Sequence, residues 1–141
     1  MSHIDEAAQL LMAAWMLSEE NEGGPKPRIP TEGNILDRAL QVSIREGAFP
    51  EWFRGILHFT DGSTGLECLE LQEILKVAQK RRLTTAPNPS YHATELRISA
   101  RVARWRLKRL NVSEEDAKGW ANILRNAIIQ IKGGTPTLVD E

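Results

Sequence analysis

Basic side chains are concentrated in one segment of this 141-residue chain. Residues 76–109 contain ten Lys and Arg side chains and a single acidic one, Glu95. Nine of these bases are candidates for binding a charged partner, and they are Lys80, Arg81, Arg82, Arg97, Arg101, Arg104, Arg106, Lys108 and Arg109. Guanidinium and ammonium groups at this density bind phosphates or carboxylates, so the segment predicts duplex DNA or an acidic protein surface as the partner.

The rest of the chain carries the compensating charge. Residues 1–75 hold 13 acids and 5 bases, residues 110–141 hold 5 acids and 3 bases, and the formal net charge of the whole chain is −1. Such a division between acidic and basic parts indicates a partner of opposite sign. The alternative is that the two parts neutralise each other within the fold, which would leave DNA nothing to bind.

Helical spacing gathers several of the bases on one face of the segment 96–110. Four cations at spacings of 4, 3 and 4 residues form this ridge, and they are Arg97, Arg101, Arg104 and Lys108. Apolar residues on both sides of the ridge are then expected to be buried. As a strand, the segment would alternate with period two and would need a bulge beyond Ala103. We predict the helix and keep the strand as the alternative.

A local motif overlaps this ridge. The residues that carry it are Ala93, Leu96, Ile98, Ser99, Leu107, Leu110 and Val112. This pattern resembles the helix-turn-helix of Fis-type DNA-binding domains, although Arg97 stands where that family usually has a turn glycine. The resemblance implies a first helix packed closely at Ala93 and a recognition helix capped by Ser99. It also implies that four residues face the major groove, namely Ala100, Arg101, Arg104 and Lys108.

Other residues with chemical potential form weaker patterns. His58 and Asp61 could act as a base and its orienting carboxylate, but no nucleophile accompanies them. His3 and His92 lack the spacing of metal ligands, and the glycines of "DGSTG" lack the lysine of a phosphate-binding loop. We therefore predict no enzymatic activity, no metal and no cofactor.

The cysteine count and the hydropathy pattern indicate a cellular compartment. The single cysteine, Cys68, allows no internal disulfide, and we expect it to be a small buried hydrophobe in a reducing environment. No apolar run reaches the ~20 residues of a membrane span, and the N-terminal segment lacks the basic residues of a secretory signal. These features predict a cytoplasmic protein without membrane contact.

A mainly α domain of the α+β class must position these residues. Hydrophobic residues make up 41% of the chain, enough for one core. Helical spacing predicts about five helices, near residues 3–20, 32–46, 65–83, 99–110 and 114–132. The aromatic segment 52–59 predicts one short strand or hairpin. We expect residues 1–134 to form a single globular domain and residues 135–141 a flexible tail.

The large apolar side chains on the predicted helical stripes define the expected core. They are Leu11, Trp15, Leu40, Leu75, Trp105, Trp120, Leu124 and Ile128. Trp52 and Phe53 could anchor a partner, although burial is the expected state.

Two functions follow from these features. The first is a small transcription-related regulator that binds duplex DNA through the basic helix-turn-helix-like segment, with affinity falling as salt rises. Arg101, Arg104 and Lys108 would then recognise the base sequence of the DNA. The second is a protein-interaction module or inhibitor, for example a phage-type or accessory factor that binds RNA polymerase or another host protein without contacting DNA. The sequence decides neither the partner nor the oligomeric state.

Overall fold

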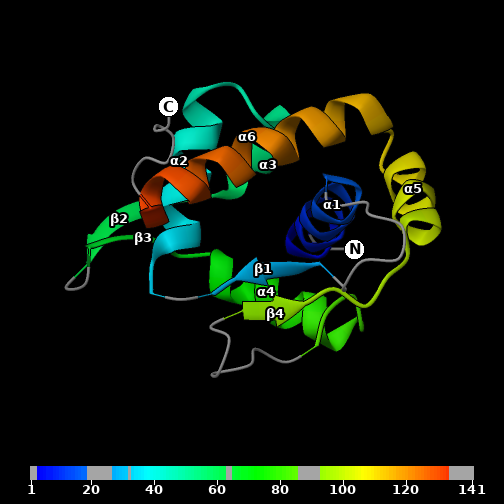
Figure 1. Cartoon of the computed structure of the whole chain (residues 1–141), viewed down its shortest axis with the longest axis horizontal. Helices are drawn as coiled ribbons and strands as arrows, with labels where there is room; N and C mark the ends of the chain where they lie inside the picture. The colour runs from blue at the N-terminus through cyan, green and yellow to red at the C-terminus, as the bar shows by residue number, and fades with distance from the viewer. Residues whose placement is uncertain (1–2, 19–26, 32, 63–64, 86–92, 134–141) are drawn as a thin grey trace.

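A computed structural model describes residues 3–18, 27–31, 33–62, 65–85 and 93–133. Within these ranges the chain forms six helices and four short strands (Figure 1). In chain order they are α1 (His3–Ser18), β1 (Arg28–Pro30), α2 (Ile35–Arg45), α3 (Glu51–Ile56), β2 (Phe59–Gly62), β3 (Gly65–Cys68), α4 (Leu71–Lys80), β4 (Ala93–Glu95), α5 (Ala100–Arg109) and α6 (Glu114–Gly133). The predicted mainly α, α+β class is confirmed.

Helix α1 lies at the centre of the other helices. Every residue from Ala7 to Trp15 is buried, and the helix packs against α4, α5 and α6. A helix that is apolar on all sides must be surrounded by protein. Its alanines are small enough to let neighbouring helices approach closely. Figure 1 shows α6 passing above α1, with α5 at its right and α4 below.

Helix α6 crosses the molecule and packs against both α1 and α2. The Oγ of Ser113 accepts a hydrogen bond from the backbone N–H of Asp116 at 3.1 Å, which caps the helix where the sequence predicted its start. Trp120, half-buried on α6, packs against Phe49 with ring centroids 5.9 Å apart. Phe49 in turn stacks on Phe53 at 4.7 Å, so α3 is fastened to α6 through aromatic rings.

The predicted strand at 52–59 is wrong over most of its length. Residues Glu51–Ile56 form α3, whose first turn starts with hydrogen bonds from Phe53 and Arg54 to the carbonyl of Pro50. The apolar residues of this stretch recur with helical spacing, and burying Phe53 on Phe49 favours the helix.

The strands form two small antiparallel sheets. Strand β1 pairs with β4, and β2 pairs with β3 as a hairpin in which Phe59 lies opposite Cys68. The predicted helix 65–83 is therefore wrong in its first part, because Gly65–Cys68 is strand and the helix starts at Leu71.

The other predicted helices are found with bounds close to those expected. The predicted tail at 135–141 and the ends of several predicted elements lie outside the described residues. Of the described helices, none combines the length and hydropathy needed to cross a membrane.

One predicted core residue is wrong. Leu11, Trp15, Leu40, Leu124 and Ile128 are buried as expected, and Leu75 and Trp120 are half-buried. Trp105, in contrast, is 52% exposed. Helix α5 buries the opposite face, through Ala103 and Leu107, against α1 and α6.

Candidate interaction surface on helix α5

Local signals fix the two ends of α5. The Oγ of Ser99 accepts a hydrogen bond from the N–H of Val102 at 3.2 Å and so caps the first turn. At the other end Asn111 has a φ of 60°, and the N–H of Val112 bonds to the carbonyl of Leu107 at 3.0 Å. Asparagine tolerates this left-handed conformation, which closes the helix.

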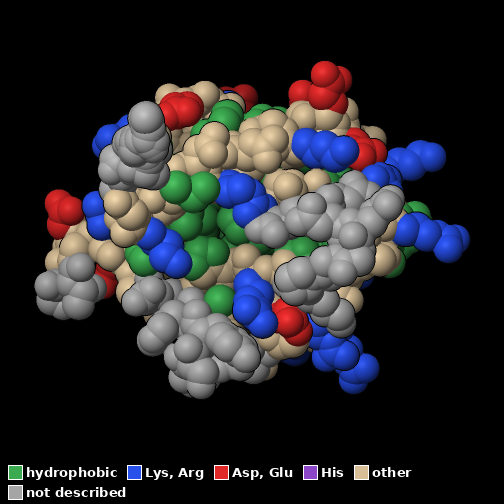
Figure 2. Space-filling model, in the orientation of Figure 1, with side chains coloured by type: hydrophobic (Ala, Val, Ile, Leu, Met, Phe, Trp, Pro, Cys, Tyr) green, Lys and Arg blue, Asp and Glu red, His purple; other side chains and the backbone are tan. Residues whose placement is uncertain are grey.

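The outward face of α5 carries the exposed residues of the helix. These residues form the α5 surface, and they are Arg101, Val102, Arg104, Trp105, Lys108 and Arg109. Figure 1 places α5 at one edge of the molecule, and Lys and Arg side chains project from that edge in Figure 2. Because α1 and α6 cover the other side of the helix, this face meets solvent.

Three cations of the α5 surface have no acidic partner in the part of the chain that the structure describes. Within the described residues, Arg101, Lys108 and Arg109 form no ion pair. Arg104 differs, since its Nε lies 3.1 Å from a carboxylate oxygen of Glu114. Hydrogen bonds from Arg104 and Lys118 hold the pKa of Glu114 below its usual range. Of the ridge predicted from the sequence, Arg97 is wrongly placed, because it precedes α5. Arg104 is paired with Glu114, and Arg101 and Lys108 form no ion pair with any residue that the structure describes.

Two of the predicted site residues form contacts with other side chains of the protein. Arg106 points back toward α1, where its Nη1 donates to Oε1 of Gln9 at 3.0 Å. Arg81 pairs with the buried Asp5, which also accepts a hydrogen bond from Gln9 at 3.4 Å. This polar chain links α4, α1 and α5. Arg81 and Arg106 thus help to position α5 and are only partly available to a partner.

The structure brings the end of α4 next to the start of α5. The backbone N–H of Arg97 donates to the carbonyl of Leu83 at 2.8 Å, and Thr84 forms a β-bridge with Leu96. Exposed cations therefore flank this junction from both elements. They are Lys80, Arg82 and Arg97, none of which forms an ion pair within the described residues.

Trp105 is the feature of this surface that the sequence did not predict. The guanidinium carbon of Arg109 lies 5.0 Å from the centroid of its ring, and that of Arg106 lies 5.8 Å away. These are distances at which a cation is attracted to an aromatic face. Val102, one turn earlier, is 36% exposed and adds apolar area. The surface therefore combines cations with an accessible aromatic ring.

His58 forms its side-chain contact with Glu70, not with Asp61, within the described residues. Nδ1 of His58 lies 2.7 Å from Oε2 of Glu70, and its backbone N–H donates to Oε1 of the same carboxylate at 2.7 Å. Burial raises the pKa of Glu70, but the hydrogen bonds from His58 together outweigh it and leave the pKa below its ordinary value. The arrangement ties the chain before β2 to the start of α4.

Cys68 is buried, as expected, and lies beside this pair, with Sγ 3.9 Å from Glu70 Oε1. Burial is the main reason that the pKa of its thiol is raised to about 11. The thiol is therefore protonated at neutral pH, and its environment does not activate it as a nucleophile.

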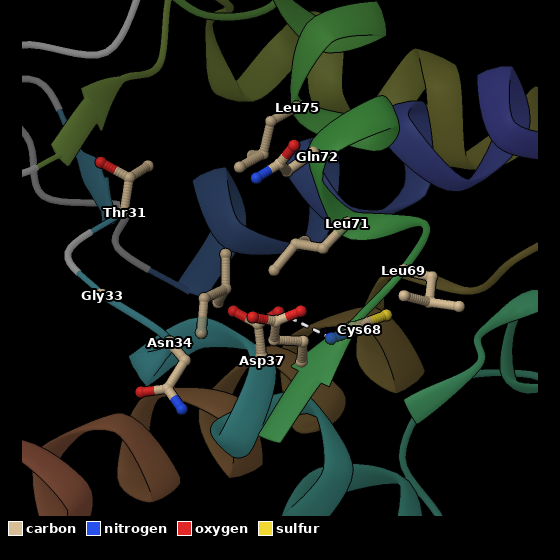
Figure 3. A pocket seen from close by; sticks show the side chains of 11 residues that line it. Thr31, Gly33, Asn34, Asp37, Cys68, Leu69, Leu71, Gln72 and Leu75 are labelled. Atoms are coloured by element: carbon tan, nitrogen blue, oxygen red, sulfur yellow. Dashed lines mark hydrogen bonds between the residues drawn. The ribbon is translucent and has the colours of Figure 1, made fainter. Parts of the chain in front are cut away.

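A pocket of about 460 Å³ opens between α2, β3 and α4 (Figure 3). Asp37 and Cys68 meet at its wall, where the carboxylate accepts the backbone N–H of Cys68 at 2.7 Å. Leu71, Gln72 and Leu75 line it from α4. No Lys, Arg or His stands among the described residues that line it, so this pocket is chemically distinct from the basic surface. The described residues also contain no group of three metal-ligating side chains.

The geometry around residues 93–112 differs from a helix-turn-helix. Residues Ala93–Glu95, which the resemblance makes the first helix, form β4 and pair with β1. Of the residues of the pattern that the structure describes, only those of the second helix are helical, as α5. Comparisons with protein-family models, curated proteins and solved structures gave no significant match to this chain, so the resemblance stays a prediction.

Proposed function

We propose that this protein binds DNA through the α5 surface and acts in the regulation of transcription. The observation that carries the proposal is the set of cations on α5 without an acidic partner among the described residues: Arg101, Lys108 and Arg109. In a chain with a formal net charge of −1, this leaves the positive charge collected on one face and available to phosphates.

The position of α5 in the fold also supports DNA binding. Helix α5 lies at the edge of the fold with its long face outward (Figure 1). The major groove of DNA is about 12 Å wide and admits a helix in this position. Arginine contacts phosphates and can also donate two hydrogen bonds to a guanine edge. The exposed bases Lys80, Arg82 and Arg97 lie next to the helix start and would extend the phosphate contacts.

A salt titration tests the proposal. Three phosphates neutralised by α5 alone give a slope of log K against log salt of about −2.7, so the affinity for random duplex falls about 40-fold between 50 and 200 mM salt. Fluorescence anisotropy of a labelled duplex measures this slope. We expect Arg101→Glu combined with Lys108→Glu to abolish most of the binding.

A charge reversal elsewhere is the matched control. Arg38 is exposed on α2, which packs against α6 and β3 and lies at the far side of the molecule from α5 in Figure 1. Arg38→Glu is expected to leave the affinity within about twofold of the wild type, because surface charges more than ~10 Å away are screened. Equal losses per reversed charge in both variants would show a general charge effect and would reject α5 as the site.

An acidic protein surface is the second candidate. The observation that favours it is Trp105 beside arginines, because tryptophan and arginine dominate the binding energy of protein interfaces. The two candidates separate in one experiment. Protein capture from nuclease-treated lysate, lost with the Arg101→Glu and Lys108→Glu variant and accompanied by no binding to duplex, would favour the protein partner.

A further inference from the structure

We infer that the α5 surface prefers single-stranded DNA and stacks an unpaired base on the indole of Trp105. This inference rests on the DNA-binding function proposed above and specifies the strand state of the ligand. It follows from the position of Trp105, the chemistry of its neighbours and the surfaces that paired and unpaired DNA offer.

Trp105 is exposed because of where α5 is anchored. Ala103 and Leu107 bury the inner face of the helix, and Trp105 lies between them in sequence, which places it on the opposite face. Trp105 is 52% exposed as a residue, which leaves apolar surface in water. A flat partner that covered the indole would remove this surface from water, and a nucleobase has that shape.

Double-stranded DNA offers no free base face to this ring. In a duplex the faces are covered by neighbouring pairs, and the grooves present only base edges, methyl groups and the backbone. Stacking on Trp105 would then require unstacking a base pair first, which costs free energy. In a single strand the faces are accessible, and proteins that bind single strands combine aromatic platforms with a basic groove.

The cations are placed to hold the backbone on both sides of a stacked base. Arg101 precedes Trp105 by about one turn, and Lys108 follows it by about one turn. With a rise of 1.5 Å per residue, these two cations are separated by about 10 Å along the helix axis. Arg109 lies against the indole at 5.0 Å and can contribute a second planar group to the platform. The site therefore spans only a few nucleotides.

The test compares strand states with and without the ring. Labelled oligo(dT) and a hairpin duplex of equal nucleotide number are titrated with wild type and with Trp105→Ala. We expect wild type to bind the single strand more tightly. We expect Trp105→Ala to weaken single-strand binding about fivefold to a hundredfold, since this is the range for loss of one stacked base. Binding to the duplex should change by less than about twofold.

Two further variants make the result specific. Trp105→Phe keeps a smaller aromatic ring and should lose less single-strand affinity than Trp105→Ala. Ile129→Ala removes another exposed apolar side chain, 47% exposed on α6, and should have no effect on either probe. Circular dichroism of each variant is expected to match the wild type, because both side chains lie at the surface.

The outcomes separate the inference from the function on which it rests. Binding to duplex without preference for the single strand, or equal effects of Trp105→Ala on both probes, would overturn the inference and keep DNA binding. Absence of binding to both probes would overturn the proposed function and the inference with it.

Discussion

The thiol of Cys68 gives a prediction that does not depend on any ligand. Cys68 is 4% exposed at the end of β3, and its pKa is raised from an ordinary value of 9.0 to about 11. Burial is the largest cause, and the charges of Glu70 and Asp37 add to it, while backbone hydrogen bonds from Glu70 and Leu71 partly offset it. The folded protein therefore resists forming the thiolate, whereas the unfolded chain forms it readily.

The sign of the pH dependence follows from this difference. A raised folded pKa means that the stabilising contribution is complete below pH 9 and is lost as the pH rises toward 11. For these two values the linkage relation gives a loss of about 1.4 kcal/mol by pH 10, relative to neutral pH. The maximum loss, above pH 11, is about 2.7 kcal/mol.

Guanidinium chloride unfolding at pH 7, 8, 9 and 10 measures the effect. Many groups titrate in this range, so the informative quantity is the difference in unfolding free energy between wild type and Cys68→Ala. This difference should shrink by about 1.3 kcal/mol between pH 8 and 10. Cys68→Ser is the control, because it also removes the titration and should follow the same pH dependence as Cys68→Ala. Parallel curves for wild type and both variants would refute the assigned burial of the thiol.

Three further outcomes are expected. Leu107→Ala, at a position 1% exposed beneath α5, should lower the unfolding free energy by about 2–5 kcal/mol in a denaturant titration. Asp5→Ala should cost about 2 kcal/mol in the same assay, because it leaves Arg81 without its buried partner, and a loss below 0.5 kcal/mol would contradict the pairing. His58→Ala should raise the pKa of Glu70, measured by NMR titration of its carboxyl carbon, and should reduce stability above that pKa and leave it unchanged where the carboxyl is protonated.

Local signals explain why most helices could be predicted from the sequence. The capping hydrogen bonds of Ser99 and Ser113 each span three residues, and α5 and α6 begin close to where the sequence predicted. The failures involve distant contacts. The carboxylate of Asp37 accepts a hydrogen bond from the backbone N–H of Cys68, the last residue of strand β3. The two residues are 31 positions apart in the chain. Phe53 of α3 stacks on Phe49, and Phe49 packs against Trp120 on α6, which is a contact between residues far apart in the chain.

The candidate site was predicted in part for the same reason. Helical spacing correctly grouped Arg101, Arg104 and Lys108, since that grouping depends only on the helix itself, but it wrongly added Arg97, which precedes the helix. It also gave two apolar stripes, and the sequence could not indicate that only the stripe with Ala103 and Leu107 meets α1. Because that stripe is buried, Trp105 on the opposite face is exposed. The side chain of Arg106 points inward and donates a hydrogen bond to Gln9, a residue 97 positions earlier in the chain.

The burial of α1 constrains how the protein is made. Helix α1 precedes α4, α5 and α6 in the chain, yet these later helices supply its covering. A ribosome therefore releases a strongly apolar helix long before its partners emerge. Contacts between distant segments form slowly, and exposed apolar surface promotes aggregation in the meantime. A nascent chain that ends before α5 contains α4 but neither α5 nor α6, so the sides of α1 that these two helices cover are still exposed at that stage.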